Sequence, residues 1–483
     1  NNYNSRDWHR SCFPLCGTGR TRRGRGMTMV HPSGPAQTRP RLHFGAFLYT
    51  PGTHSAGWRH PDAVPRTDMH FPYYVEMART AERGKLDTIF LQDTAAIGGS
   101  GGLDGASPYR PSQGRQVHLE PVSLIAALAA VTTHIGLIST ATTTYNEPYN
   151  IARRFATIDH ISGGRAGWNL VTSQVEDEAG NFGLDRHVDH ARRYDRAGEF
   201  YDVVAGLWDS WEEDAFLRDK ESGIWFDFDK MHFLHHRGEH FSVRGPLNVS
   251  RTPQGRPVVA QAGSSDVGRE LAARSADLVF TAQITIEEGR AFCDDLRGRA
   301  ERHGRGRNDI KILPGLMPIV GRTDAEAAEQ FQQLQELIDD SLAIRAVARL
   351  AGGLDIQQFP LDGPLPPLPP SNAAKARQQL IVDLARKENL TIRQVARYLG
   401  TSQGHRVLHG SARTIADSME EWLLAGACDG FNLLFPYFPG PLNDFVDLVV
   451  PELQRRGIFR TEYEGRTLRE NLGVPVPKNR YAK

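Results

Sequence analysis

The stretch GRAGWNLVTS, residues 164–173, begins with small and apolar residues and ends with polar ones. Its last part presents the amide of Asn169 and the hydroxyls of Thr172 and Ser173. In a purely hydrophobic core, each of these groups would cost roughly 1–3 kcal/mol unless it were hydrogen-bonded. Amides and hydroxyls hold the polar edge of a ligand but are weak acids and bases. This run therefore predicts one wall of a binding site.

Polar groups also follow three other short apolar runs that have the composition of strands. The C-terminal ends of parallel strands in a barrel meet on one face, which is where the active sites of barrel enzymes lie. We therefore expect these groups to gather around one mouth. The residues concerned are His54, Trp58, Asp93, Thr140 and Thr142.

The sequence QAGSSDVGRE predicts a strand that turns through Gly263 into a helix. The first turn of a helix has N–H groups without partners inside the helix, and with the hydroxyls of Ser264 and Ser265 they would suit a phosphate. The simpler alternative is that one serine only caps the helix. This segment is therefore a candidate phosphate site.

His190 and Tyr194 are four residues apart in HARRYD, so they share one face of a predicted helix. Either this face only packs and His190 is a surface histidine, or both side chains point into the mouth at the strand ends. The sequence leaves both possibilities open.

The elements that would position these residues alternate along the chain. Short β-branched runs are separated by segments with helical periodicity, which is typical of parallel strands with helical crossovers. Eight such runs predict a closed (β/α)8 barrel, that is, a TIM barrel, with an open doubly wound sheet as the alternative. The predicted strands are 42–49, 87–92, 135–140, 166–171, 257–263, 277–282, 310–320 and 430–436; the clearest helices are 71–85, 121–134, 189–211, 264–276 and 325–342.

Two insertions interrupt this alternation, one after strand 4 and one before strand 8. Residues 212–256 have the pattern of a small hairpin excursion, and residues 352–405 begin with a stiff proline-rich stretch followed by two helical segments. The barrel as a whole is expected to span residues 41–470, with a C-terminal tail at 471–483.

The first forty residues differ from the rest because they are basic, rich in glycine and without an apolar period. We expect residues 1–40 to be a disordered extension. Met27 is the expected natural start, and an arginine-rich targeting peptide is the alternative.

The composition excludes several classes of protein. Lys plus Arg equals Asp plus Glu, at 57 each in 483 residues, so no overall field attracts nucleic acid or a membrane surface. No apolar run is long enough to span a bilayer. The four cysteines form no disulfide framework, which favours a reducing cytoplasm.

Two other motifs are weak. The sequence HFLHHRGEH offers His232, His235, His236 and His240, but it lacks the spacing of a zinc site, so no metal is expected. The sequence LTIRQVARYLGTSQGHRV resembles a helix-turn-helix, although it has few basic residues, so packing on the barrel is the preferred interpretation. The common dinucleotide, P-loop and nucleophile-elbow motifs do not occur.

Several long motifs in order resemble the bacterial-luciferase-like flavin-dependent monooxygenases that include nitrilotriacetate monooxygenase component A, dibenzothiophene-sulfone monooxygenase and pristinamycin IIA synthase. Those that carry the resemblance include RLHFGAFLYTPGTHSAGWRHPDA, TATTTYNEPYNIARRFATIDHISGGRAGWNLVTS, NFGLDRHVDHARRYDRAGEF and PVVAQAGSSDVGRELAARSADLVFT. The resemblance runs from about residue 41 to residue 470 and includes the second insertion.

The resemblance implies a two-component enzyme that receives reduced FMN from a separate NAD(P)H:FMN reductase. A flavin C4a-peroxide would transfer one oxygen atom of O₂ to a small organic substrate, often with cleavage of a C–N or C–S bond. Family members are commonly homodimers or homotetramers. An alkane-acting relative has histidine where this chain has Gln174, which argues against an alkane substrate.

The resemblance also assigns roles to the strand-end residues. The cofactor-binding set is Asp93, Thr140, Thr142, Asn169, Thr172, Ser173, His190, Tyr194, Ser264 and Ser265. His190 and Asn169 are the catalytic candidates, with His190 expected to stabilise or protonate the peroxide. His54 and Trp58 would face the substrate. The alternatives are a barrel that binds flavin without oxygenase activity and a deazaflavin (F420) dehydrogenase.

Overall fold

The computed structural model describes residues 40–64, 69–97, 117–338, 347–348, 351, 354–369 and 375–482. Residues 1–39 of the predicted basic extension lie outside the described residues. None of the helices within the described ranges is long and apolar enough to cross a membrane.

Parallel strands close into a ring, which confirms the predicted TIM barrel and excludes an open sheet. The sheet order is β10-β9-β11-β1-β2-β3-β4-β7-β8, and β8 pairs again with β9. The eight strands of the ring are β1 (His43–Phe47), β2 (Thr88–Leu91), β3 (Gly136–Thr142), β4 (Ala166–Val171), β7 (Val258–Gln261), β8 (Leu278–Thr281), β9 (Lys311–Gly321) and β11 (Gly430–Leu434). Every predicted strand overlaps one of them.

One strand was not predicted. β10 (Arg406–Ser411) begins directly after the second insertion, at the end of the stretch that resembles a helix-turn-helix. It pairs with the upper half of β9, from Leu316 to Gly321, outside the ring. The length of β9 explains this, because its lower half pairs with β8 and its upper half remains available for another strand.

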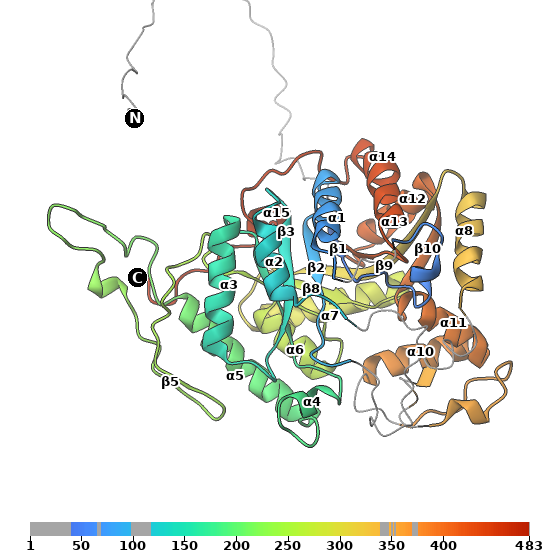
Figure 1. Ribbon diagram of the computed structural model, residues 1–483, viewed down its shortest axis with the longest axis horizontal. Helices are drawn as coiled ribbons and strands as arrows, with labels where there is room; N and C mark the ends of the chain where they lie inside the picture. The colour runs from blue at the N-terminus through green and yellow to red at the C-terminus, as the bar shows by residue number, and fades with distance from the viewer. Residues whose placement is uncertain are drawn as a thin grey trace, which may run out of the picture. The chain divides into compact units, whose positions relative to one another are not determined.

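Helices cover the outside of the barrel (Figure 1). Amphipathic segments form them because an apolar stripe on each helix packs against the outward-facing side chains of the strands. They are α1 (Phe71–Arg83), α2 (Pro121–Ala129), α3 (Pro148–Ser162), α5 (His190–Trp208), α6 (Asp266–Ser275), α7 (Ile286–Arg302), α8 (Asp324–Glu336), α12 (Ala412–Leu424), α13 (Gly440–Asp444) and α14 (Val450–Arg455). The short α4 (Glu178–Asn181) lies between β4 and α5, whereas α15 (Leu468–Leu472) packs Leu468 and Leu472 into the core inside the barrel.

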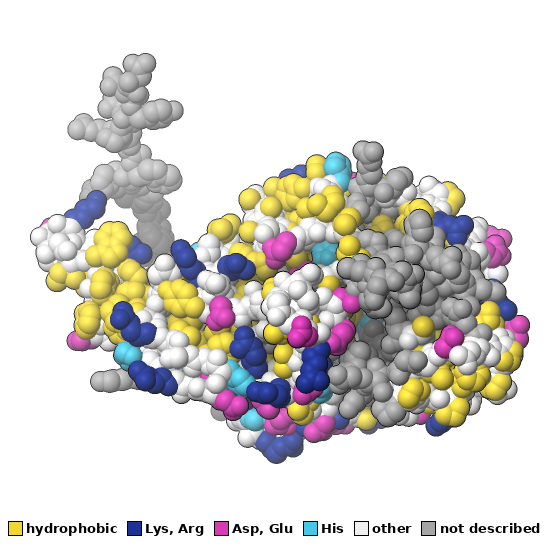
Figure 2. All heavy atoms as spheres, turned by 60° about the horizontal axis from the view of Figure 1, so that its bottom comes forward, with side chains coloured by type: hydrophobic (Ala, Val, Ile, Leu, Met, Phe, Trp, Pro, Cys, Tyr) yellow, Lys and Arg dark blue, Asp and Glu magenta, His cyan; other side chains and the backbone are white. Residues whose placement is uncertain are grey.

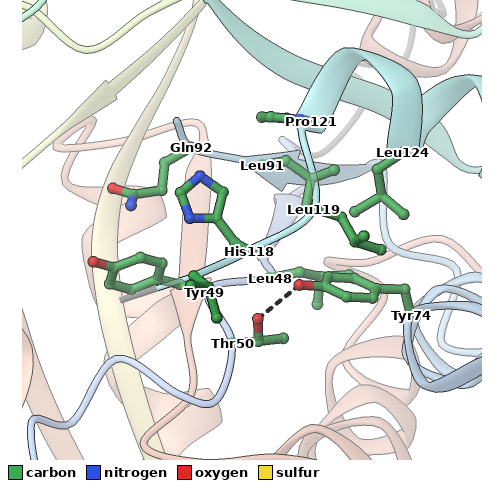
Figure 3. Close-up of a pocket in the computed structure, with 11 residues that line it drawn as sticks. Leu48, Tyr49, Thr50, Tyr74, Leu91, Gln92, His118, Leu119, Pro121 and Leu124 are labelled. Atoms are coloured by element: carbon green, nitrogen blue, oxygen red, sulfur yellow. Dashed lines mark hydrogen bonds between the residues drawn. The ribbon is translucent and has the colours of Figure 1, made fainter. Parts of the chain in front are cut away.

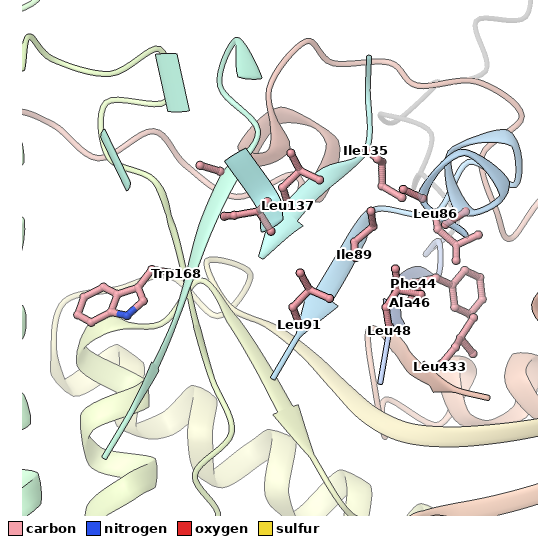
Figure 4. Close-up of a cluster of buried hydrophobic side chains, with 14 of the residues drawn as sticks. Phe44, Ala46, Leu48, Leu86, Ile89, Leu91, Ile135, Leu137, Trp168 and Leu433 are labelled. Carbon is pink, nitrogen blue, oxygen red and sulfur yellow. The ribbon is translucent and has the colours of Figure 1, made fainter. Parts of the chain in front are cut away.

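Successive side chains of each strand face opposite sides of the barrel wall. Phe44, Ile89 and Trp168 point outward into the large core under the helices (Figure 4). Phe47 and Phe90 point inward and belong to a second core that fills the lumen. The lumen is therefore packed, and only the strand ends are available to bind a ligand.

The two ends of the barrel differ in chemistry. Three carboxylates stand just before strands at the N-terminal end, and each pairs with an arginine: Asp87 with Arg460, Asp277 with Arg469, and Asp429 with Arg297. Arg460 and Arg469 come from the C-terminal segment, which therefore closes this end. The ion pairs at the N-terminal end of the barrel stabilise the fold, whereas the amides and hydroxyls that could bind a ligand lie at the C-terminal end.

The insertion between α5 and β7 contains the short antiparallel hairpin of β5 (His236–Arg237) and β6 (Ser242–Val243), as predicted. An arm of residues 212–231 precedes the hairpin. Large apolar side chains of the arm are about half exposed or more, and hydrophobic atoms gather on this part of the surface (Figure 2): Leu217, Ile224, Trp225 and Phe228.

The second insertion supplies α10 (Lys375–Lys387) and α11 (Ile392–Ser402), the two helical segments that the sequence predicts. Ile392, Val395 and Leu399 of α11 are buried in a small separate core. That face of α11 packs against protein, which supports the packing interpretation over a DNA-reading helix.

Candidate active site

A chain of hydrogen bonds across the ends of β4, β3 and β2 fixes the amide of Asn169. Asn169 Nδ2 lies 2.7 Å from Thr140 Oγ1, and the Thr140 hydroxyl donates to the Leu91 carbonyl over 2.9 Å. Because that hydroxyl has a single proton, it accepts from Asn169, which assigns the amide orientation. Asn169 Oδ1 is buried and has no hydrogen-bond partner among the described residues. It is therefore an acceptor in need of a donor.

The end of β4 curls back toward β3. Ser173 has a left-handed backbone with φ 55°, and its hydroxyl donates to Thr142 Oγ1 over 2.9 Å. The Thr172 carbonyl accepts from the Thr144 hydroxyl over 2.7 Å. Thr142 and Ser173 are thus together, as expected. Thr172 joins this network through its backbone.

The start of α6 lies against the hydroxyl of Tyr194 from α5. Ser265 Oγ accepts from the N–H of Gly268 over 3.2 Å, so the capping interpretation is confirmed for Ser265. A Cβ added at Gly268 would lie 3.0 Å from Ser265 Oγ and 3.1 Å from Tyr194 Oη, so both hydroxyls border one spot. The Ser264 hydroxyl makes no hydrogen bond within the described part of the chain. Hydroxyls beside the N–H groups of a helix start are suitable donors for a phosphate.

His190 is the first residue of α5, and its ring centroid lies 4.9 Å from that of Tyr194. Both side chains are partly buried. The two candidates therefore lie together beside the start of α6.

Arg193, which the sequence interpretation missed, is buried on the same helix. It is 2% exposed and donates to the Ser173 carbonyl, and its Nη1 lies 2.6 Å from His187 Nε2. It forms no ion pair within the described ranges, and its Nε is buried without a partner. A buried cation without a carboxylate is costly unless an anion joins it. Its position in HARRYD gave no signal, because a charge on a helix is usually solvated.

A tyrosine and a histidine complete this cluster. Burial, and then the charge of Arg193, lowers the pKa of His187, so its Nε2 accepts from the guanidinium. Its Nδ1 therefore has the ring proton and donates to Tyr145 Oη, 2.5 Å away. The neutral imidazole thus holds Arg193 without cancelling its charge.

Asp93, at the end of β2, pairs with a second residue that the sequence interpretation missed. Its Oδ1 lies 3.0 Å from His118 Nε2. His118 stands in an irregular segment before α2, where no periodic pattern indicates its direction. His118 and Gln92 line a pocket beside the ends of β1 and β2 (Figure 3).

His54 and Trp58 lie in the loop after β1. His54 is 1% exposed, and its Nδ1 accepts from the N–H of Ala56 over 3.2 Å, whereas Trp58 is 38% exposed. The N–H of Ser55 donates to the Gly400 carbonyl of α11 over 2.8 Å. The second insertion therefore fixes the loop that carries both residues.

The histidines of the first insertion pair with carboxylates. His232 Nε2 lies 2.9 Å from Glu212 Oε1, and His236 Nε2 lies 2.8 Å from Glu199 Oε1. No group of three or more residues able to hold a metal occurs in the described ranges.

Comparison with known proteins identifies the family. Residues 45–427 match the family model of luciferase-like monooxygenases. The chain belongs to the luciferase-like monooxygenase family. It is therefore an enzyme, a monooxygenase of this flavin-dependent class.

Two relatives match over nearly their full length. Nitrilotriacetate monooxygenase component A from Aminobacter aminovorans is 50% identical over 92% of this chain and 98% of its own length. N-acetyl-S-(2-succino)cysteine monooxygenase from Bacillus subtilis (strain 168) is 49% identical over 92% of this chain and 99% of its own. A solved structure of riboflavin lyase, with modified FMN and riboflavin, matches at a TM-score of 0.78 and 32% identity over 90% of this chain and 96% of that one.

Proposed function

We propose that this enzyme uses reduced FMN, supplied by a separate NAD(P)H:FMN reductase, to insert one oxygen atom of O₂ into a small organic substrate. The observation that carries the proposal is the unpartnered Oδ1 of Asn169 at the strand ends. An isoalloxazine ring has N–H groups that would satisfy this acceptor. The bound flavin supplies the activation of O₂, which no side chain of the protein provides.

The phosphate end of FMN would lie at the start of α6. Ser264, Ser265 and Tyr194 supply hydroxyls there, and the first turn of the helix supplies N–H groups. Arg193 adds a buried positive charge on the neighbouring helix. These donors fit a phosphate and give the flavin a fixed direction, with its ring toward Asn169.

The remaining side chains at the strand ends would orient the ring and exclude water. The hydrogen-bonded pair of Thr142 and Ser173 would line the ring, together with the Asp93 carboxylate at the end of β2. His190, at the first turn of α5, is the candidate proton donor near the reacting oxygen. A closed, dry site favours transfer of oxygen to substrate over its loss as hydrogen peroxide.

The two relatives at 50% and 49% identity act, by their names, on nitrilotriacetate and on N-acetyl-S-(2-succino)cysteine, both small polycarboxylates. We propose a substrate of this chemical class, with the oxidised carbon next to nitrogen or sulfur. His54 and Trp58 remain the predicted substrate-side residues. A cytoplasmic location is proposed because the four cysteines form no disulfide framework.

We also propose that the enzyme is a homodimer or homotetramer. The exposed apolar side chains of the arm, including Trp225 and Phe228, are candidates for the contact between copies. Light scattering of the purified protein measures this directly, and a monomer at micromolar concentration would contradict it.

The experiment for the proposed function is a coupled assay. Purified protein, FMN, NADH and a generic flavin reductase are incubated with amino- and thio-polycarboxylates, and substrate-dependent O₂ consumption is measured. A flavin-binding protein without oxygenase activity would bind FMN but show no such consumption. An F420 enzyme would bind F420 tightly and FMN not at all.

A further inference from the structure

A narrow pocket beside the ends of β1 and β2 has one polar side and one apolar side (Figure 3). Leu91, Leu119 and Leu124 lie on the apolar side. His118 and Gln92 lie on the polar side, where they approach one another. The pocket is small, with a cavity volume of about 20 Å³, so it has room for the polar end group of a ligand rather than for a whole molecule.

The imidazole of His118 is held from one side only. Its Nε2 lies 3.0 Å from Asp93 Oδ1, and a carboxylate only accepts hydrogen bonds, so the Nε2 proton points to Asp93. Its Nδ1 has no hydrogen bond among the residues that the structure describes. The ring is about a quarter exposed, so its second nitrogen is accessible to a ligand.

The pocket can attract an anion only through His118. Its described lining contains no Asp, Glu, Lys or Arg, and the Asp93 carboxylate contacts His118, so among the described lining residues only a protonated His118 would supply positive charge. An imidazolium between two carboxylates, one from Asp93 and one from the ligand, donates a charge-assisted hydrogen bond to each. A neutral ester in the same place would receive a weaker bond and would not balance the charge.

Other polar groups of the pocket are placed differently. Thr50 Oγ1 and Tyr74 Oη lie 2.7 Å apart and are hydrogen-bonded to each other, so that pair is engaged. The Gln92 amide can donate an N–H to the second oxygen of a carboxylate. The pocket thus offers donors from two side chains on one wall and leucines on the other.

We propose that this pocket binds a carboxylate group of the substrate, with His118 as the residue that selects for the negative charge. The inference rests on the proposed function for the identity of the substrate, but the pocket itself is defined by its own contacts. Asp93 would then serve two partners, since it holds His118 and borders the predicted flavin site.

The test compares wild type with His118→Gln, which keeps a neutral donor of similar reach. His134→Gln is the matched control, because His134 is exposed at the opposite end of the barrel, before β3. The probes are nitrilotriacetate, N-acetyl-S-(2-succino)cysteine and succinate, each beside its methyl ester. Calorimetric binding of the probes, KM and kcat in the coupled assay, and the Kd for FMN are measured for each protein.

We expect wild type and His134→Gln to prefer the acids over the esters. His118→Gln should lower that preference roughly 5- to 15-fold, which is the difference between a hydrogen bond from a charged donor and one from a neutral donor. The effect should appear in KM and in probe binding, while the Kd for FMN should stay unchanged because the substitution removes no proposed flavin contact.

Three results would overturn the inference: an acid preference that survives in His118→Gln, an effect confined to FMN binding, or no binding of any acid to wild type. Acid-selective binding without substrate-dependent O₂ consumption would instead contradict the proposed function and support the carboxylate pocket. The two failures are therefore distinguishable.

Discussion

Replacing Asn169 with leucine should move stability and flavin affinity in opposite directions. The substitution keeps the shape of the side chain, removes the hydrogen bond to Thr140, and removes the unpartnered Oδ1. The lost bond costs about 1 kcal/mol, whereas relief of an unsatisfied buried acceptor returns about 1–3 kcal/mol. The apolar leucine adds a further stabilisation of roughly 1–2 kcal/mol on burial. We therefore expect the flavin-free protein to be unchanged or more stable.

The same variant should bind reduced FMN less tightly. A flavin N–H that loses its acceptor in a closed site costs about 1–3 kcal/mol, or roughly a 5- to 150-fold rise in Kd. Denaturant unfolding measures the stability, and anaerobic fluorescence titration measures the Kd. Asn432→Leu is the matched control, because Asn432 on β11 is also buried and both of its amide atoms lack partners, but it lies deeper in the barrel. It should gain stability and leave the Kd unchanged. Undiminished FMN affinity in Asn169→Leu would refute the assignment of this acceptor to the flavin.

Three further predictions concern the start of α6 and the buried charges. Ser265→Ala should lower the stability by about 1 kcal/mol because the helix loses its cap, and it should also weaken FMN binding. Ser264→Ala should weaken FMN binding without a loss of stability. Neither variant should change the affinity for riboflavin, and equal losses of affinity for both flavins would contradict a phosphate site. Arg469→Met should destabilise the enzyme by about 3–5 kcal/mol because Asp277 stays buried without its main partner. The control, Arg83→Met, breaks an exposed ion pair and should cost less than about 1 kcal/mol. Similar losses of stability for both variants in urea unfolding would be inconsistent with this account. Burial raises the pKa of Asp159, so the folded state binds its proton more tightly and stability falls as pH rises from about 4 through the folded pKa. Asp159→Asn should reduce this dependence of stability on pH, as measured by urea unfolding at several pH values. An unchanged pH dependence would contradict the role of Asp159.

The barrel could be predicted because its signals are local. Alternating strands and helices follow from hydrophobic periodicity, and the predicted strand at 166–171 matches β4 at both ends. The serine cap of α6 is also local, since Ser265 and Gly268 are three residues apart. β10 was missed although the length of β9 was predicted, because its pairing with the upper half of β9 joins segments that lie far apart in the sequence, and a local pattern does not reveal such a contact.

Residues that act through distant contacts were not predictable. His118 and Asp93 are twenty-five residues apart, and the segment that contains His118 has no period that would indicate its direction. Arg193 lies beside two residues that were recognised, but its burial depends on the left-handed turn at Ser173 that places a carbonyl against the guanidinium. Both cases need the three-dimensional packing of strand ends from different parts of the chain.

The central claim is that this enzyme transfers one oxygen atom from O₂ to a small polycarboxylate with reduced FMN. The most direct measurement is mass spectrometry of the product formed under ¹⁸O₂, with FMN, NADH, a flavin reductase and nitrilotriacetate or N-acetyl-S-(2-succino)cysteine. We expect one labelled oxygen atom in the oxidised product or in its cleavage fragment. Consumption of O₂ only to hydrogen peroxide, with no label in any substrate-derived product although FMN is bound, would contradict the claim.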